Sequence, residues 1–183
     1  MRRCLRSDRR RGVAGVTRGK IAALLLVVPA LIAGAAMYYL QVYGYYTELE
    51  PQIGYQVATP DDGTARLDIA DFRGIDSDSS PLRYRACFAI TGSLPPLVDY
   101  ADPTPLNAPG WFDCFNAETI GEDLETGAAR AVLVESNTRY GFDHVMALYP
   151  DGRAFVWPQI NHCGEKVFDG QPAPDDCPPP PQG

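Results

Sequence analysis

A run without any ionizable side chain other than tyrosine extends over residues 21–47, and it limits where the rest of the chain can lie relative to a membrane. Its first part, Ile21–Leu40, is almost purely apolar. An α-helix rises about 1.5 Å per residue, so this stretch reaches about 30 Å, the thickness of the hydrocarbon core of a bilayer. The run therefore predicts one transmembrane helix, with all later residues on one side of a membrane.

Charge is distributed unequally on the two sides of this run. Residues 1–46 hold eight of the sixteen Lys and Arg residues and a single acidic residue, Asp8. The other eight cations stand among twenty-two acidic residues after residue 46. The positive-inside rule keeps the basic flank in the cytoplasm, and the tyrosines at 38–46 suit the opposite headgroup layer. We therefore expect a single-pass protein of the bacterial inner membrane, with a cytoplasmic N-terminus and a periplasmic C-terminal domain.

Two other interpretations compete with an uncleaved signal anchor. A soluble core helix of this length usually has a polar face, and this run has none. A cleaved signal peptide would use Ile21–Ile32 as its apolar region and Ala33-Gly34-Ala35 as its cleavage site. Apolar and aromatic residues continue to Leu40, which favours the uncleaved anchor. Ala30 and Gly34 form a small-xxx-small pair through which two helices can approach, so a homo-oligomer is also considered.

Four of the five cysteines follow the apolar run: Cys87, Cys114, Cys163 and Cys177. An even number of cysteines in an oxidising compartment predicts two disulfides. Three pairings are open, and loop closure favours Cys87–Cys114 with Cys163–Cys177. No Cys-x-x-Cys sequence is present, so the usual motif of a thiol oxidoreductase is missing.

The sequence divides into five segments. A basic head (residues 1–20) precedes the transmembrane helix (21–43), a juxtamembrane linker (44–62), a periplasmic domain (63–170) and a proline-rich tail (171–183). Asn116 and Gly127 bracket a predicted helix over Ala117–Thr126. Apolar patterning predicts strands at residues 65–72, 82–90, 130–135, 142–149, 153–160 and 164–169. The fold class is therefore α+β, with one main helix and an antiparallel sheet that includes a three-strand meander over residues 130–160.

Arg83 and Arg85 are the candidate ligand-binding residues of the domain. At alternate positions of a strand, their guanidinium groups point to one face, where two forks can bind a carboxylate or a phosphate. The alternative is that both arginines pair with the domain's own Asp and Glu residues. The acidic composition of residues 47–183 argues against nucleic acid as a partner.

No catalytic motif or metal site is recognisable, and we predict no cofactor. His162-Cys163 supplies two ligands where zinc needs three or four, and this cysteine is expected in a disulfide. The run Asp76-Ser77-Asp78 begins like a calcium loop, but Pro81 stands where that loop requires glycine, so a turn is favoured. For an enzyme without a known motif, Asp76, Asp78 and His144 are the acid–base candidates.

Several longer stretches resemble an uncharacterised family of small single-pass membrane proteins from marine and phototrophic alphaproteobacteria. The stretches that carry the resemblance are Ala33–Tyr43, Asp76–Phe88, Ala108–Phe115, Tyr149–Gly152 and the region from Ile160 to the proline tail. The resemblance implies a domain of unknown function and transfers no catalytic residue. Some members carry a histidine kinase label, which this chain does not support because it has no nucleotide-binding motif. The members begin near Gly19-Lys20, which implies that translation starts at Val16 and that the preceding residues are an over-extended gene model.

Three functions therefore stay open. The first is a non-enzymatic module, tethered through Ile21–Leu40, that binds or assembles a protein partner at the inner membrane or in the periplasm. The second is a small-anion sensing or binding domain that uses Arg83 and Arg85. The third is an enzyme without a recognisable motif.

Overall fold

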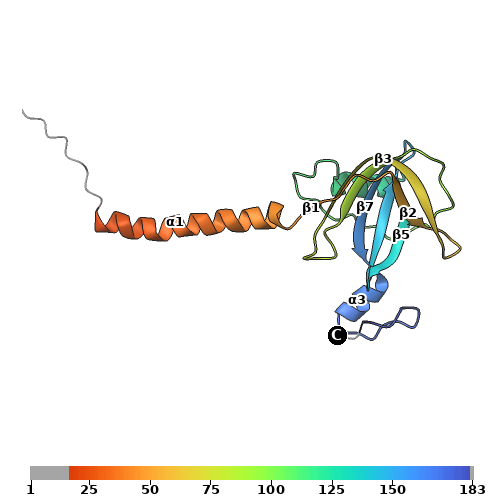
Figure 1. Ribbon diagram of the computed structural model, residues 1–183. Helices are drawn as coiled ribbons and strands as arrows, with labels where there is room; N and C mark the ends of the chain where they lie inside the picture. The colour runs from red at the N-terminus through yellow and green to blue at the C-terminus, as the bar shows by residue number, and fades with distance from the viewer. Residues whose placement is uncertain (1–16, 182–183) are drawn as a thin grey trace, which may run out of the picture. The chain divides into compact units, whose positions relative to one another are not determined.

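The computed structural model describes residues 17–181, which form an apolar helix and a β-rich domain (Figure 1). The chain divides into two compact units, one ending at Gln41 and the other beginning at Val42. Most of the predicted basic head, Cys4 and the expected start at Val16 lie outside the described residues.

Helix α1 (Arg18–Tyr39) is followed by one π-helical turn, η1 (Leu40–Gly44). No residue of α1 is buried against the protein, and its leucines expose about half or more of their surface. Residues 18–44 are long and apolar enough to cross a membrane, as either an anchor or a signal sequence. A helix with apolar side chains on every face is stable in lipid or against other helices, not alone in water.

The domain is built on one antiparallel sheet of seven strands. In chain order they are β1 (Thr47–Glu48), β2 (Gly54–Ala58), β3 (Thr64–Asp76), β4 (Arg85–Ile90), β5 (Arg130–Arg139), β6 (Phe142–Leu148) and β7 (Arg153–Ile160). The spatial order is β1-β3-β4-β7-β6-β5, and β2 also pairs with β3. Because β2 and β5 contact each other, the sheet curls until its two ends meet (Figure 1).

Two short helices and two loops complete the domain. Helix α2 (Ala117–Thr126) lies between β4 and β5, and helix α3 (His162–Phe168) follows β7. The backbone of Val98 and Tyr100 pairs with β5 through hydrogen bonds from Tyr100 N to Ala131 O and from Leu133 N to Val98 O. The outer side of β5 is therefore covered by the chain's own loop.

Apolar side chains cover both faces of the curled sheet. The enclosed face carries residues of β2, β3, β4, β5, β6 and β7, with Val57, Val132, Met146 and Val156 fully buried. The other face carries Trp157, Val145 and Cys87, and it is covered by Phe112, Phe115 and Ile120 of the loop before α2 and of α2 itself. Each central strand thus has two buried faces, which explains why β4 shows no exposed side.

Most elements predicted from the sequence are confirmed. Helix α2 has the predicted bounds because Asn116 Oδ1 accepts a hydrogen bond from Thr119 N, and Gly127 ends the helix at φ +74°. Strands β5, β6 and β7 form the predicted antiparallel meander, and β7 has its predicted limits.

Three features differ from the sequence predictions. The strand expected at residues 164–169 is helix α3, because Asn161 Oδ1 accepts a hydrogen bond from Gly164 N and caps a helix there. Strand β2 lies in the segment predicted as a linker. The strand expected to begin at Leu82 begins at Arg85, because a turn extends through Leu82.

Candidate functional site

A partly buried polar cluster joins the second half of β5 to the start of α3, and the buried Asp143 is its centre. We define the polar cluster as Tyr100, Ser136, Asn137, Asp143 and Asn161. Asp143, which is 7% exposed, accepts hydrogen bonds from Asn161 Nδ2 (2.7 Å), Asn137 N (2.9 Å), Tyr100 Oη (3.2 Å) and Ser136 Oγ (3.3 Å). Burial and the adjacent Asp143 carboxylate raise the pKa of Tyr100 well above its ordinary value. The Tyr100 hydroxyl therefore stays protonated at neutral pH and donates its hydrogen bond to Asp143.

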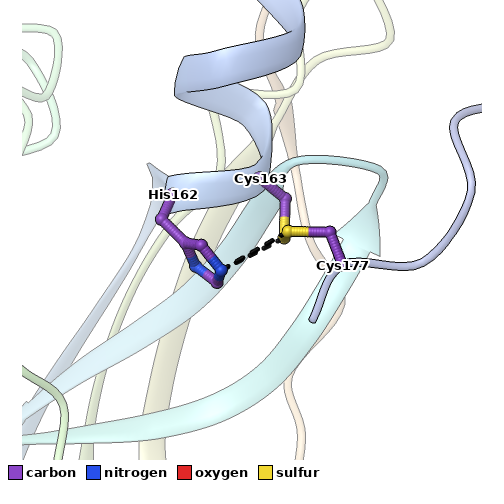
Figure 2. A group of neighbouring side chains, drawn as sticks. All are labelled: His162, Cys163 and Cys177. Carbon is purple, nitrogen blue, oxygen red and sulfur yellow. Dashed lines mark hydrogen bonds between the residues drawn. A yellow bond between two sulfur atoms is a disulfide. The ribbon is translucent and has the colours of Figure 1, made fainter. Parts of the chain in front are cut away.

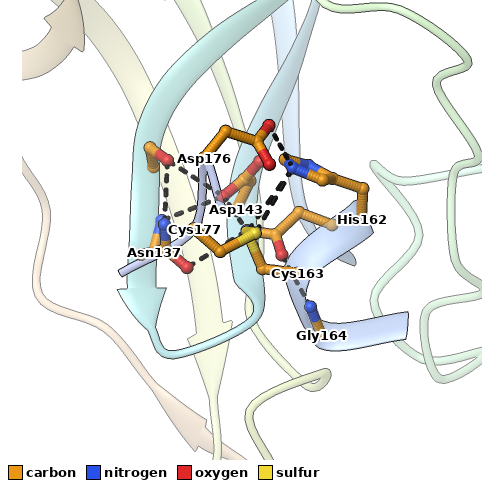
Figure 3. Close-up of polar contacts among 9 residues, drawn as sticks. Asn137, Asp143, His162, Cys163, Gly164, Asp176 and Cys177 are labelled. Atoms are coloured by element: carbon orange, nitrogen blue, oxygen red, sulfur yellow. Dashed lines mark hydrogen bonds and ion pairs between the residues drawn. A yellow bond between two sulfur atoms is a disulfide. The ribbon is translucent and has the colours of Figure 1, made fainter. Parts of the chain in front are cut away.

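A second group of side chains lies next to the polar cluster (Figure 3). His162 Nε2 is 3.6 Å from Cys163 Sγ, 3.4 Å from Cys177 Sγ and 2.9 Å from Asp176 Oδ2. Figure 2 shows the imidazole ring turned toward the Cys163–Cys177 disulfide. Cys163 is buried in α3, whereas His162 and Asp176 are exposed. We call His162, Cys163, Asp176 and Cys177 the tail cluster.

The structure places the four described cysteines in the pairing that loop closure favours. Cys87 bonds to Cys114 across 27 residues, and Cys163 bonds to Cys177 across 14 residues. The first bond fastens the loop before α2 to β4, and the second fastens the segment after residue 170 to α3. Residues 91–116 contain little regular structure, so this loop is positioned by its backbone hydrogen bonds to β5 and by side-chain and disulfide contacts.

His144 and Asp76, two of the acid–base candidates, interact electrostatically. The His144 ring stacks on Tyr84 with ring centroids 4.7 Å apart, and Tyr84 Oη lies 2.7 Å from Tyr55 Oη. Burial, with a smaller contribution from the Asp76 charge, raises the pKa of Tyr84 to about 12. The two hydroxyls are hydrogen bonded to each other and the His144 ring is covered, so these residues form a packed group. Asp78 is exposed in the turn that follows β3.

Burial of His144 predicts that the stability of the domain depends on pH. Desolvation lowers the pKa of His144 below its ordinary value, although the charges of Asp76 and Asp143 oppose this shift. The unfolded chain therefore binds more protons than the folded chain as the pH falls below about 6.5. We expect the free energy of unfolding to decrease from pH 7 to pH 5 and to decrease less in His144→Gln. Urea denaturation at several pH values measures this difference, and parallel curves for both proteins would contradict it.

The two candidate anion-binding arginines have different surroundings. Arg85 is 3% exposed and donates four hydrogen bonds to backbone carbonyls. Nε binds Leu106 O, Nη2 binds Asn107 O, and Nη1 binds both Leu82 O and Tyr84 O, at 2.6 to 2.9 Å. Burial lowers the pKa of Arg85 to about 10, which leaves it charged at neutral pH. Four of the five N–H groups of a guanidinium are thus occupied, which argues against an anion site at Arg85.

Arg83 lies outside β4 and contacts the tyrosines that follow η1. Its guanidinium carbon is 5.5 Å from the ring centroid of Tyr45 and 5.2 Å from that of Tyr46, in cation–π geometry. Trp111 Nε1 donates a hydrogen bond to Val42 O at 2.7 Å, and the Trp111 ring stacks on Tyr43. The first residues of the domain are therefore packed onto it by Arg83 and Trp111.

Two surface clefts are lined by few ionizable residues. One cleft of about 620 Å³ lies between the β2–β3 turn and β5, and its ionizable lining residues are Asp62, Asp99 and Glu135. A second cleft of about 480 Å³ lies beside the β6–β7 turn, where Arg130 and Asp151 line it.

Sequence reasoning missed the polar cluster and the place of Asp176 in the tail cluster. Asp143 and Asn161 stand eighteen positions apart and meet only because β6 and β7 are neighbours. Asp176 joins His162 only through the disulfide that brings residue 177 to α3. The usable signal was local: Asn161 three residues before Gly164 is a helix N-cap pattern.

Comparison with known proteins gives a family but no activity. Residues 55–178 match the model of a family of unknown function, DUF6446. No curated protein and no solved structure matches the chain. The matched range includes β2 to α3, both disulfides, the polar cluster and the tail cluster.

Proposed function

The chain belongs to DUF6446, a family of unknown function, and we propose that it is a membrane-anchored, non-enzymatic module that binds or assembles a protein partner. Helix α1 holds it in the bacterial inner membrane, with the N-terminus in the cytoplasm. The domain from Val42 onward lies in the periplasm, where a partner in the membrane or in the periplasm binds its surface.

The anchor is supported by the exposure of α1 and by the distribution of charge. Every side chain of α1 is exposed, and these side chains are almost all apolar, so the helix gains from transfer into lipid. The basic residues precede it and the acidic residues follow it, as the positive-inside rule requires for export of the domain. Two disulfide pairs suit an oxidising compartment.

The packed interior of the domain is the observation that favours recognition on its outer surface over binding of a ligand inside the curled sheet. Val57, Val132, Met146 and Val156 are fully buried on the enclosed face of the sheet, where a ligand-binding barrel would hold a cavity. The buried carboxylate of Asp143 and the guanidinium of Arg85 bond to groups of the chain itself. Recognition therefore takes place on the outer surface of the domain.

A topology experiment tests the placement. Alkaline phosphatase, which is active only after export, is fused after Gly183 in one protein and after Lys20 in a matched control. We expect activity from the first fusion alone, and a full-length product in the membrane fraction. A shortened product in the soluble fraction would establish a cleaved signal peptide and remove the anchor. Absence of phosphatase activity from an intact, membrane-bound Gly183 fusion would reverse the orientation.

Crosslinking in intact cells tests the proposed partner. We expect one dominant crosslinked product when the full chain carries a photoreactive residue on the exposed surface of the domain. The matched control places the same residue at the buried position Val156, where no product is expected. A product of twice the chain's mass that Gly34→Leu abolishes would identify a second copy as the partner. A monomer at every exposed position would contradict the proposed function.

A further inference from the structure

The tail cluster contains the donor set of a zinc site, assembled from two distant parts of the chain. His162 and Cys163 begin α3, and Asp176 and Cys177 arrive from the segment after it (Figure 3). One nitrogen of His162 and the two sulfurs lie within 4.8 Å of one another. The Asp176 carboxylate adds an oxygen 2.9 Å from the same nitrogen. Imidazole, two thiolates and a carboxylate are all ligands that zinc accepts.

The separations between the imidazole nitrogen and the two sulfurs match those around a tetrahedral zinc ion. Zn–N and Zn–S bonds of about 2.0 and 2.3 Å place the nitrogen and each sulfur about 3.5 Å apart in a tetrahedron. His162 Nε2 is 3.6 Å from Cys163 Sγ and 3.4 Å from Cys177 Sγ. The two sulfurs are bonded to each other, so they can bind zinc as thiolates only after the disulfide is reduced.

The two sides of the cluster differ in how firmly the chain holds them. Cys163 is 3% exposed, and the preceding Asn161 is bonded to Asp143, Asn137 and Gly164. Cys177 lies outside the sheet, in the segment after α3, and its backbone N–H donates a hydrogen bond to Pro174 O. After reduction, Cys177 can therefore move away from Cys163 without disturbing the sheet.

We propose that reduction of the Cys163–Cys177 disulfide converts the tail cluster into a site for one Zn²⁺ ion. A protein dithiol of the exported thiol–disulfide exchange class donates two electrons and two protons; the S–S bond breaks, two thiols form, and the donor becomes a disulfide. Zn²⁺ then displaces the two thiol protons and is bound by Cys163 Sγ, Cys177 Sγ, His162 Nε2 and an Asp176 oxygen. Disulfide sulfur carries no thiolate charge, so oxidised chain does not bind the ion.

Cobalt binding to the full chain in detergent tests the proposal. The chain is reduced with a phosphine, freed of reductant under argon and titrated with Co²⁺, whose thiolate charge-transfer and tetrahedral d–d absorption report the ligands. We expect both bands to saturate at one equivalent, to disappear when Zn²⁺ is added, and to be absent from oxidised chain. Cys163→Ser with Cys177→Ser should abolish the bands, which separates this pair from Cys87 and Cys114.

Single substitutions then identify the other two ligands. His162→Gln and Asp176→Asn change exposed side chains, so the domain stays folded, and each should weaken binding of Zn²⁺ about 10-fold or more. Asp175→Asn is the matched control for Asp176 and should bind as the unchanged chain does. Absence of the thiolate band in reduced chain would overturn the proposal. Equal affinity of the His162→Gln, Asp176→Asn and Asp175→Asn variants would overturn it too.

Discussion

Replacing the buried Arg85 with methionine is expected to lower the free energy of unfolding by about 4 kcal/mol, the larger of the two effects discussed here. Methionine fills much of the same volume but leaves the carbonyls of Leu82, Tyr84, Leu106 and Asn107 without their donor. These hydrogen bonds are partly buried, and each carbonyl that loses its donor costs about 1 kcal/mol. Urea denaturation of the full chain in detergent, followed by tryptophan fluorescence, measures the loss.

Arg83→Met is the matched control for this prediction. The Arg83 guanidinium makes cation–π contacts with Tyr45 and Tyr46, and within residues 17–181 its buried Nη1 has no hydrogen-bond partner, so its replacement should cost about 1 kcal/mol. If both variants lose the same small amount, Arg85 is not structural. Stabilisation of the unchanged chain by phosphate, lost in Arg85→Met, would restore the anion site that the sequence suggested.

The second large effect is expected at Asp143, whose replacement by alanine should cost about 3 kcal/mol. Four donors from Tyr100, Ser136, Asn137 and Asn161 lose their acceptor at once. Asn161 caps α3, so amide hydrogen exchange should become faster in α3 and in the β5–β6 turn before it changes in β4.

Asp143→Asn separates the charge of this residue from its shape. Asparagine keeps one oxygen acceptor for the amide donors and offers Tyr100 Oη a donor, so it should lose less than half as much stability as alanine. Equal losses for both substitutions would show that the negative charge itself holds the cluster. An unchanged exchange rate in α3 of Asp143→Ala would contradict the link between the cluster and this helix.

Local signals made much of the fold predictable. Asn116 and Gly127 mark the two ends of α2 because a cap and a left-handed glycine act within a few residues. The Pro150-Asp151-Gly152 turn and its flanking apolar residues define the β6–β7 hairpin in the same way. The apolar character of α1 needs no tertiary information at all.

The remaining features depend on contacts between distant residues. The alternation of side chains along a strand places Arg85 on the same face as Arg83. The loop at Leu106 and Asn107 nevertheless folds over Arg85 and supplies two of the carbonyl oxygens that accept its hydrogen bonds. Strand β2 is too short to stand out in the sequence and exists because β3 pairs with it. The tail cluster requires the pairing of Cys163 with Cys177, which loop-length reasoning favours but which does not reveal that Asp176 meets His162.

The curled sheet also limits how another polypeptide can join the domain. Residues 98–100 already occupy the hydrogen-bonding side of β5, and β2 lies against β5 where the sheet meets itself. An incoming β-strand therefore finds no long, open row of amide and carbonyl groups on these two strands, the usual starting point for strand addition and for amyloid growth. On these two strands, contact with another polypeptide therefore depends on side chains in place of backbone pairing.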